Sequence, residues 1–190
     1  MPETRGIVAT ARAGALQLAD CLSGVDEAAL DQLYDAIVSA HAIFVAGAGR
    51  SMLMLRPFAM RLMHVGLTSF VVGDTTTPAF QADDLLIVAS GSGSTKSVVT
   101  TASTVKKLGG KVAAFTIRSE SALGELADVV VAIPAYSDKG GFEKAARPVL
   151  IGGGLFEQSV LFLGDALIVP LAAERGISTD VAFPLHANLE

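Results

Sequence analysis

The chain is poor in the residues that mark secreted or disulfide-stabilised proteins. Of its 190 residues one is cysteine and none is tryptophan, and aromatic residues make up 6%. The single Cys21 cannot form an internal disulfide, which favours a reducing compartment and hence a cytoplasmic protein. The first residues, MPETRGIVATARAG, contain no continuous apolar stretch, so we do not expect a secretion signal there.

Charged residues are scarce as well, at 17% with a net charge of -5. This balance argues against a nucleic-acid partner, because nucleic-acid-binding proteins usually present a basic surface. Hydrophobic residues make up 51% of the chain. No continuous apolar run reaches the roughly 20 residues that a membrane-spanning helix needs. We therefore expect no membrane partner, and we expect part of the apolar surface to be buried between subunits.

The order of apolar patterns predicts an α/β fold. Residues 1–40 contain two stretches with apolar residues at helical spacing. Between residues 42 and 135, short apolar runs alternate with helical stretches; the runs are 42–47, 68–72, 85–90, 111–117 and 129–135. Strands that are apolar throughout are buried on both faces, which is typical of parallel sheets. We predict a three-layer sandwich with a five-stranded parallel sheet in the order 2-1-3-4-5 and helices at both ends of the chain.

The C-terminal part contains a helix that is apolar nearly all round, which predicts a buried helix. Pro170 is expected to kink this helix or to end its regular part. The chain has no internal repeat and no linker-like segment, so we predict a single domain. Its parts are the N-terminal helices in residues 1–40, the sheet core in 42–135, and a C-terminal helix and tail in 154–190.

Two glycine- and hydroxyl-rich loops predict a site for a phosphate group. GAGRS, residues 47–51, follows the first strand, and SGSGST, residues 90–95, follows the third. Glycine lets the backbone approach a ligand closely, and the N-terminus of the following helix favours an anion. In the predicted strand order the first and third strands are neighbours at the point where the order reverses. Ligands bind at this point in open parallel sheets.

The hydroxyl groups of these loops are the candidate phosphate ligands. Helix capping would account for one hydroxyl group at each helix, but not for four among six residues. A dinucleotide site is disfavoured because GAGRSM does not match the G-x-G-x-x-G pattern. The candidate ligands are Ser51, Ser90, Ser92 and Thr95, and further substrate contacts are expected from Gly49, Arg50, Gly91, Gly93 and Ser94.

Other polar residues are ambiguous when judged from position alone. Glu157 stands near the start of the apolar helix, where its surroundings would suit a general base. Its position is also explained by the attraction between a first-turn carboxylate and the helix dipole. Position alone favours this second explanation. Spacing assigns no role to His41, His64 or His186, and it shows no cluster of metal ligands.

Several motifs together resemble those of the 6-phospho-3-hexuloisomerases, which belong to the sugar isomerase (SIS) domain family. They are GAGRS, FAMRLMHVGL, VGDTTTPAF, DLLIVASGSGST and the C-terminal HANLE. The similarity extends from about residue 44 to 117 and resumes at GLFEQ and HANLE. The serine-rich loop alone marks SIS domains in general, whereas the combination is much more specific.

The resemblance implies conversion of 3-hexulose 6-phosphate to fructose 6-phosphate through an enediol, without a metal or organic cofactor. This step belongs to the ribulose monophosphate pathway of formaldehyde assimilation and follows hexulose-phosphate synthase. The resemblance assigns phosphate binding to Ser51, Ser90, Ser92 and Thr95. It makes Glu157 the catalytic base and His186 the acid or ring-opening group, and it implies a homotetramer, a dimer of dimers with sites shared between subunits.

Two alternative functions remain open at this level. The first is an SIS isomerase that acts on an aldose–ketose pair, against which HANLE and GDTTTP argue. The second is a non-catalytic module that senses sugar phosphates. Such modules are usually fused to a DNA-binding domain, whereas about 40 residues precede the first strand here, without a basic recognition helix.

Overall fold

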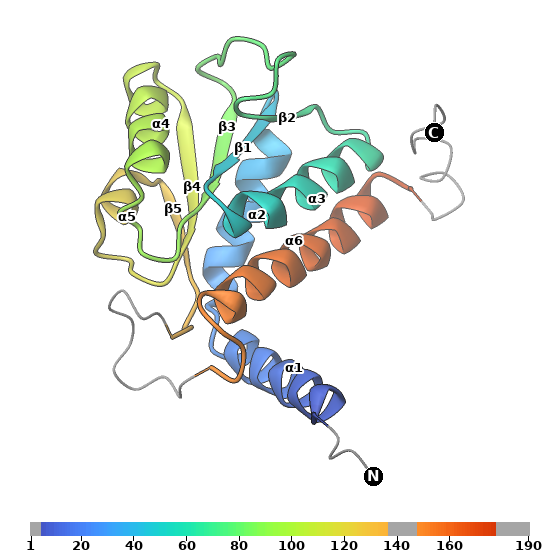
Figure 1. Cartoon of the computed structure of the whole chain (residues 1–190). Helices are drawn as coiled ribbons and strands as arrows, with labels where there is room; N and C mark the ends of the chain where they lie inside the picture. Colours follow the sequence, from blue (N-terminus) through green and yellow to red (C-terminus); the bar gives the residue numbers. More distant parts are fainter. Residues whose placement is uncertain (1–4, 137–147, 178–190) are drawn as a thin grey trace.

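The structure is a computed structural model of the chain, which describes residues 5–136 and 148–177. Within these residues, six helices and one five-stranded sheet form the fold (Figure 1). All neighbouring strands are parallel, in the order β2-β1-β3-β4-β5. The prediction of an α/β fold with strand order 2-1-3-4-5 is confirmed. The predicted tail with His186 lies outside the described residues.

The strands form where the apolar runs were found, and each ends within its run. They are β1 (Ile43–Gly47), β2 (Ser69–Val71), β3 (Leu85–Ala89), β4 (Lys111–Thr116) and β5 (Val129–Ala132). All five residues of the central strand β3 are buried. The register pairs Ile43 with Leu85 and Gly47 with Ala89, so β1 and β3 end at the same level. The loops that follow these two strands therefore begin side by side.

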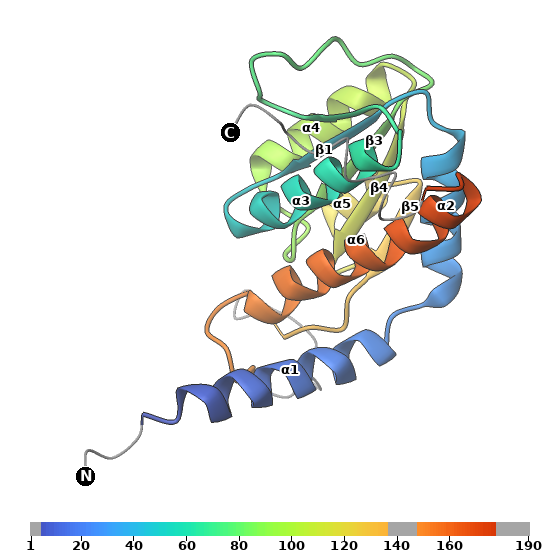
Figure 2. The ribbon, with the colours of Figure 1, turned by 90° about the vertical axis from the view of Figure 1, so that its right-hand side faces the viewer.

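The helices form two layers, one on each face of the sheet (Figures 1 and 2). They are α1 (Ile7–Ser23), α2 (Glu27–Ser39), α3 (Arg50–His64), α4 (Lys96–Lys107), α5 (Ala122–Leu126) and α6 (Gly154–Glu174). One core cluster joins α1, α2, α3 and α6 to the sheet, and a second joins α4 and α5 to the other face. This arrangement is the three-layer sandwich expected from strands that are apolar on both sides.

Helix α6 is apolar because it is a core helix. Within the described part of the chain, it alone is long and apolar enough to cross a membrane, with a mean hydropathy of 1.5 and 44% of its most apolar window buried. Glu157, Asp165 and Glu174 interrupt its apolar sequence. It packs along α3, where a Cβ added to Gly164 would lie 3.2 Å from the Phe58 ring. This packing accounts for the buried part of its apolar sequence, while Phe162 and Val169 are more than half exposed.

Pro170 does not end helix α6, which continues to Glu174. Of the two effects predicted for Pro170, ending the regular part of the helix is therefore wrong, and a kink stays a prediction. A proline removes a single backbone hydrogen bond and crowds one preceding carbonyl group. The packing of buried neighbours such as Leu167 and Leu171 stabilises the helix on both sides of this position.

Candidate active site

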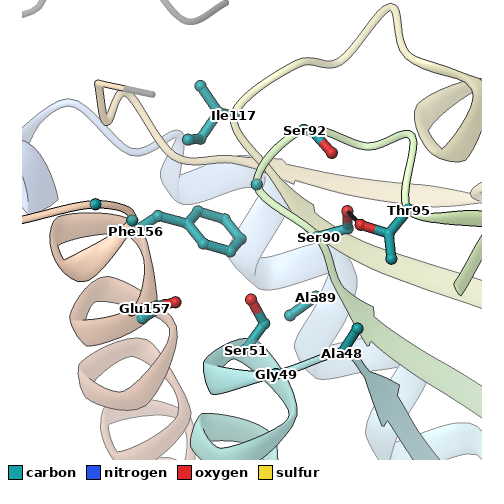
Figure 3. Close-up of a pocket in the computed structure, with 13 residues that line it drawn as sticks. Ala48, Gly49, Ser51, Ala89, Ser90, Ser92, Thr95, Ile117, Phe156 and Glu157 are labelled. Carbon is teal, nitrogen blue, oxygen red and sulfur yellow. Dashed lines mark hydrogen bonds between the residues drawn. The ribbon is translucent and has the colours of Figure 1, made fainter. Parts of the chain in front are cut away.

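A cavity of about 440 Å³ opens at the carboxyl ends of β1 and β3 (Figure 3). Two of its walls are the predicted loops, and the third is the beginning of α6. This is the position that the reversal of strand order predicts for a ligand site. The residues that line it are Ala48, Gly49, Ser51, Ala89, Ser90, Gly91, Ser92, Thr95, Ile117, Gly152, Gly153, Phe156 and Glu157.

Three helices begin at this cavity, and none of the three has a side-chain cap. The N-cap residues Gly49 of α3, Thr95 of α4 and Gly153 of α6 all line the cavity and make no side-chain capping bond. Of the other three described helices, Asp26 caps α2 and Ser121 caps α5, while α1, which begins away from the cavity, also has no side-chain cap. Uncapped first-turn N–H groups and the positive ends of helix dipoles both favour an anion. The cavity is thus suited to a phosphate group.

The hydroxyl groups of residues 90–95 are ordered by hydrogen bonds within the loop. Ser90 Oγ and Thr95 Oγ1 lie 2.9 Å apart. Ser92 Oγ accepts hydrogen bonds from the Ser94 N–H group at 3.3 Å and from Ser94 Oγ at 3.1 Å. These contacts hold the loop in one shape, so little conformational freedom is lost when an anion binds.

Neighbouring segments fix the same loop from outside. The N–H groups of Ile117 and Leu123 donate to the carbonyl oxygens of Gly91 and Gly93, at 3.1 Å and 3.0 Å. Gly93 has φ +61°, and a Cβ atom there would lie 1.9 Å from Ser121 Oγ. Position 93 therefore requires glycine for its backbone conformation and for its close contact with the N-terminus of α5.

The first loop turns sharply from β1 into α3. Gly49 has φ 56° and ψ -134°, a conformation that residues with a side chain rarely adopt. A Cβ atom on Gly47 would lie 2.9 Å from the Met52 nitrogen atom. Both glycines let the first turn of α3 approach the end of β1. The Ser51 hydroxyl group then points into the cavity (Figure 3).

One wall of the cavity is apolar. Phe156 and Ile117 are each 2% exposed, and both pack against Gly91, where an added Cβ would lie 3.4 Å and 3.3 Å from their side chains. Figure 3 shows the Phe156 ring between α6 and the serine-rich loop. This wall limits the access of water from one side, which strengthens polar interactions inside the cavity.

A single carboxylate faces the hydroxyl groups. Glu157 is the only charged side chain among the described residues that line the cavity. Its Oε2 atom accepts a hydrogen bond from Arg50 Nε at 2.5 Å. The Glu157 side chain is 13% exposed, whereas that of Arg50 is 62% exposed. The cavity thus places a largely buried carboxyl group, paired with Arg50, opposite the anion-binding loops.

The structure brings most of the predicted site residues together. Ser51, Ser90, Ser92, Thr95 and Glu157 line the cavity, as do Gly49 and Gly91. The other expected contacts, Arg50, Gly93 and Ser94, do not line the cavity. Arg50 reaches the cavity through its ion pair with Glu157, while Gly93 and Ser94 support the loop. His186 lies outside the described residues.

Sequence reasoning missed the apolar wall and the third helix N-terminus. Ile117 and Phe156 have the character of ordinary core residues in the sequence, because no local pattern distinguishes a cavity wall from a core. The glycine run 152–154 did carry a signal. Like the glycines of the two loops, it stands directly before a helix, and two of its members line the cavity.

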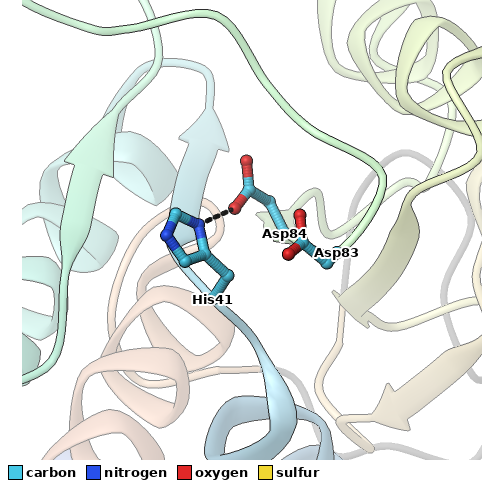
Figure 4. Close-up of side chains that lie close together, drawn as sticks. All are labelled: His41, Asp83 and Asp84. Atoms are coloured by element: carbon cyan, nitrogen blue, oxygen red, sulfur yellow. Dashed lines mark hydrogen bonds and ion pairs between the residues drawn. The ribbon is translucent and has the colours of Figure 1, made fainter.

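A second polar cluster lies at the opposite edge of the sheet, before β1 and β3 (Figure 4). Ligand atoms of His41, Asp83 and Asp84 lie within 4.8 Å of one another, a proximity that the spacing in sequence did not show. Asp84 is buried, and both of its oxygen atoms have partners. Oδ1 lies 3.1 Å from His41 Nδ1, and Oδ2 accepts from the Gln81 N–H group at 2.7 Å. These hydrogen bonds stabilise the turn before β3. The cluster therefore has a structural explanation.

Comparison with known proteins places the chain in a family. The SIS domain matches residues 36–145. A 3-hexulose-6-phosphate isomerase of Bacillus subtilis is 46% identical over 162 residues, covering 84% of this chain and 86% of the relative. The isomerase of the same name from Mycobacterium gastri is 46% identical over 174 residues, covering 92% of this chain and 86% of the relative.

A solved structure supports the same relationship. It is that of a Methanococcus jannaschii protein whose inferred function is that of a 3-hexulose-6-phosphate isomerase. It is 34% identical with a TM-score of 0.78, covering 95% of this chain and 97% of the other. The chain therefore belongs to the SIS domain family and, within it, to the family of the 3-hexulose-6-phosphate isomerases.

Proposed function

We propose that this protein interconverts 3-hexulose 6-phosphate and fructose 6-phosphate. The observation that carries the proposal is the convergence of three uncapped helix N-termini and one carboxylate on a single cavity. Uncapped helix N-termini suit a phosphate group, and a carboxylate suits proton transfer. Membership of the isomerase family identifies the reaction class that needs both.

The two sugars differ in whether C2 or C3 carries the carbonyl group. A base removes the proton from C2 of the 3-ketose, and the C3 carbonyl oxygen accepts a proton, which gives an enediol between C2 and C3. Return of a proton to C3 and loss of the proton from the C2 hydroxyl group then give the 2-ketose. The reaction moves protons only, so it needs a positioned base, a proton donor for oxygen and a fixed substrate.

Different residues bind the phosphate group, move the proton between carbon atoms and donate a proton to oxygen. Ser51, Ser90, Ser92 and Thr95 hold the phosphate group together with the N–H groups of α3 and α4. Glu157 moves the proton between the adjacent carbon atoms. The proton donor for oxygen is His186, which the family resemblance indicates and which lies outside the described residues. No step assigned to these residues needs a metal or an organic cofactor.

The assembly and the metabolic setting belong to the same proposal. The protein is a cytoplasmic homotetramer whose subunits share active sites, and hexulose-phosphate synthase supplies its substrate during formaldehyde assimilation. Large apolar side chains that are more than half exposed on α1 and α6 support an assembly; they are Ile7, Val8, Leu16, Phe162 and Val169. Burial of such side chains between subunits would be favourable.

A coupled assay tests the function. Hexulose-phosphate synthase would supply the substrate from formaldehyde and ribulose 5-phosphate, and fructose 6-phosphate would be measured through glucose-6-phosphate isomerase and its dehydrogenase. We expect Glu157→Gln to lose at least about 100-fold in kcat, the scale of general base catalysis. We expect it to keep the rise in melting temperature that fructose 6-phosphate causes.

Glu174→Gln is the matched control, because Glu174 lies at the far end of α6. Ser92→Ala should weaken binding of the sugar phosphate. Undiminished turnover in Glu157→Gln would exclude Glu157 as the base. Wild-type protein that binds sugar phosphates without forming fructose 6-phosphate would exclude the proposed reaction.

A further inference from the structure

The Glu157 carboxylate has one partner among the described residues, the Arg50 guanidinium. We propose that Arg50 is a positioning residue that holds this carboxylate aimed into the cavity. The inference rests on the proposed function, in which Glu157 is the base. It gives Arg50 a role different from the direct substrate contact that its place in the GAGRS loop predicts.

The contact fixes the direction of the carboxylate. Arg50 is the first residue of α3, and Glu157 lies in the first turn of α6. These helices pack along each other, so both ends of the ion pair stand on rigid elements (Figure 2). Arg50 Nε binds Oε2, and no hydrogen bond within the described residues engages Oε1. One oxygen atom is thus held while the other remains available to take a proton.

Charge explains why the base needs this partner. A carboxylate and a phosphate dianion in one cavity of about 440 Å³ repel each other. An adjacent guanidinium offsets this repulsion, and it stays charged at any pH at which the protein is folded. Repulsion from the bound phosphate would otherwise push the carboxylate away from its position in the cavity.

The other side chains that line the cavity carry no charge. The loop of residues 90–95 presents hydroxyl groups, the segment before α6 presents Gly152 and Gly153, and the remaining wall presents Phe156 and Ile117. Within the described residues, Arg50 is the one cationic side chain that forms an ion pair with this carboxylate.

The experiment compares Arg50→Gln and Arg50→Lys in the full-length protein with Arg56→Gln. Arg56 is a matched control because it also lies on α3 and also forms an ion pair, with Nη2 at 2.7 Å from Asp74 Oδ1. Neither Arg56 nor Asp74 lines the cavity. The measurements are kcat, KM and the melting temperature.

Arg50→Gln should lower kcat about 10- to 100-fold, the scale of a misplaced catalytic group, and change KM less than about threefold. Arg50→Lys keeps the charge without the planar geometry, so it should recover part of the lost kcat. Arg56→Gln should leave kcat and KM unchanged.

The inference is overturned if Arg50→Gln keeps the wild-type kcat while its melting temperature matches that of Arg56→Gln. A large rise in KM at constant kcat would also overturn it and would make Arg50 a direct substrate ligand. Glu157→Gln separates these results from failure of the proposed function. If that variant is inactive and Arg50→Gln behaves as wild type, only the role of Arg50 is wrong.

Discussion

Ser90 Oγ and Thr95 Oγ1 lie 2.9 Å apart, so the N-cap side chain of α4 binds the loop rather than its own helix. A threonine at an N-cap position usually accepts a hydrogen bond from a first-turn N–H group. Here the Thr95 side chain binds no first-turn N–H group of α4. The arrangement gives up a local stabilising bond of the helix and leaves the helix N-terminus open for an anion.

Thr95→Val tests this exchange, because valine keeps the shape of threonine and lacks the hydroxyl group. We expect KM for the sugar phosphate to rise about tenfold, the effect of one lost hydrogen bond to a charged group. The melting temperature should fall as well, because the buried Ser90 hydroxyl group loses its hydrogen bond to Thr95. The measurements are steady-state kinetics and thermal unfolding.

Thr101→Val is the control for Thr95→Val. Thr101 lies on the same helix, and its hydroxyl group donates to the Ser97 carbonyl oxygen at 3.0 Å, away from the cavity. Its KM should remain that of the wild type. If KM is the same in both variants, Thr95 does not contribute to binding of the anion.

Gly93→Ala should destabilise the protein more than Gly73→Ala does. Both glycines have positive φ, at +61° and +97°, so each alanine meets backbone strain of about 1–2 kcal/mol. A Cβ atom at position 93 would also lie 1.9 Å from Ser121 Oγ, whereas nothing lies within 4 Å at position 73. Urea unfolding should show the larger loss for Gly93→Ala, together with weaker sugar-phosphate binding. Equal losses would contradict the close packing of the loop.

Cys21 should make stability depend on pH in the alkaline range. Burial raises the pKa of the Cys21 thiol, the hydrogen bond from Ser159 opposes this, and the Asp20 charge adds to it. A raised pKa means that the folded state holds the thiol proton more tightly than the unfolded state. The resulting stability is present below the ordinary thiol pKa of about 8.5 and is lost as pH rises towards the folded value.

Urea unfolding of wild type and Cys21→Ala between pH 7 and pH 10 measures this effect. The free energy of unfolding of the wild type should fall more steeply with pH, because the variant lacks the titrating thiol. The difference between the two proteins cancels the contributions of lysine and tyrosine. If the free energy of unfolding changes equally with pH in wild type and in Cys21→Ala, Cys21 ionises as easily in the folded protein as in the unfolded chain.

Much of the fold could be read from the sequence, because its signals are local. Apolar runs such as 85–90 and 111–117 identified buried strands, and the observed β3 and β4 lie inside them. The strand order followed from general rules of parallel sheets, and the two loops followed from glycine and hydroxyl content. The end of α6 was misjudged at Pro170 because packing along the whole helix outweighs one lost backbone hydrogen bond.

The sequence by itself determined the strands, the helices and the hydroxyl-rich loops, since each depends on residues close together in the chain. Only the tertiary structure decided which side chains meet. Glu157 joins Arg50 across 107 positions, and His41 joins Asp84 across 43. Phe156 and Ile117 become a cavity wall only when α6 packs beside the end of β4. Such contacts depend on how separate elements pack, and periodicity along a single element does not encode them.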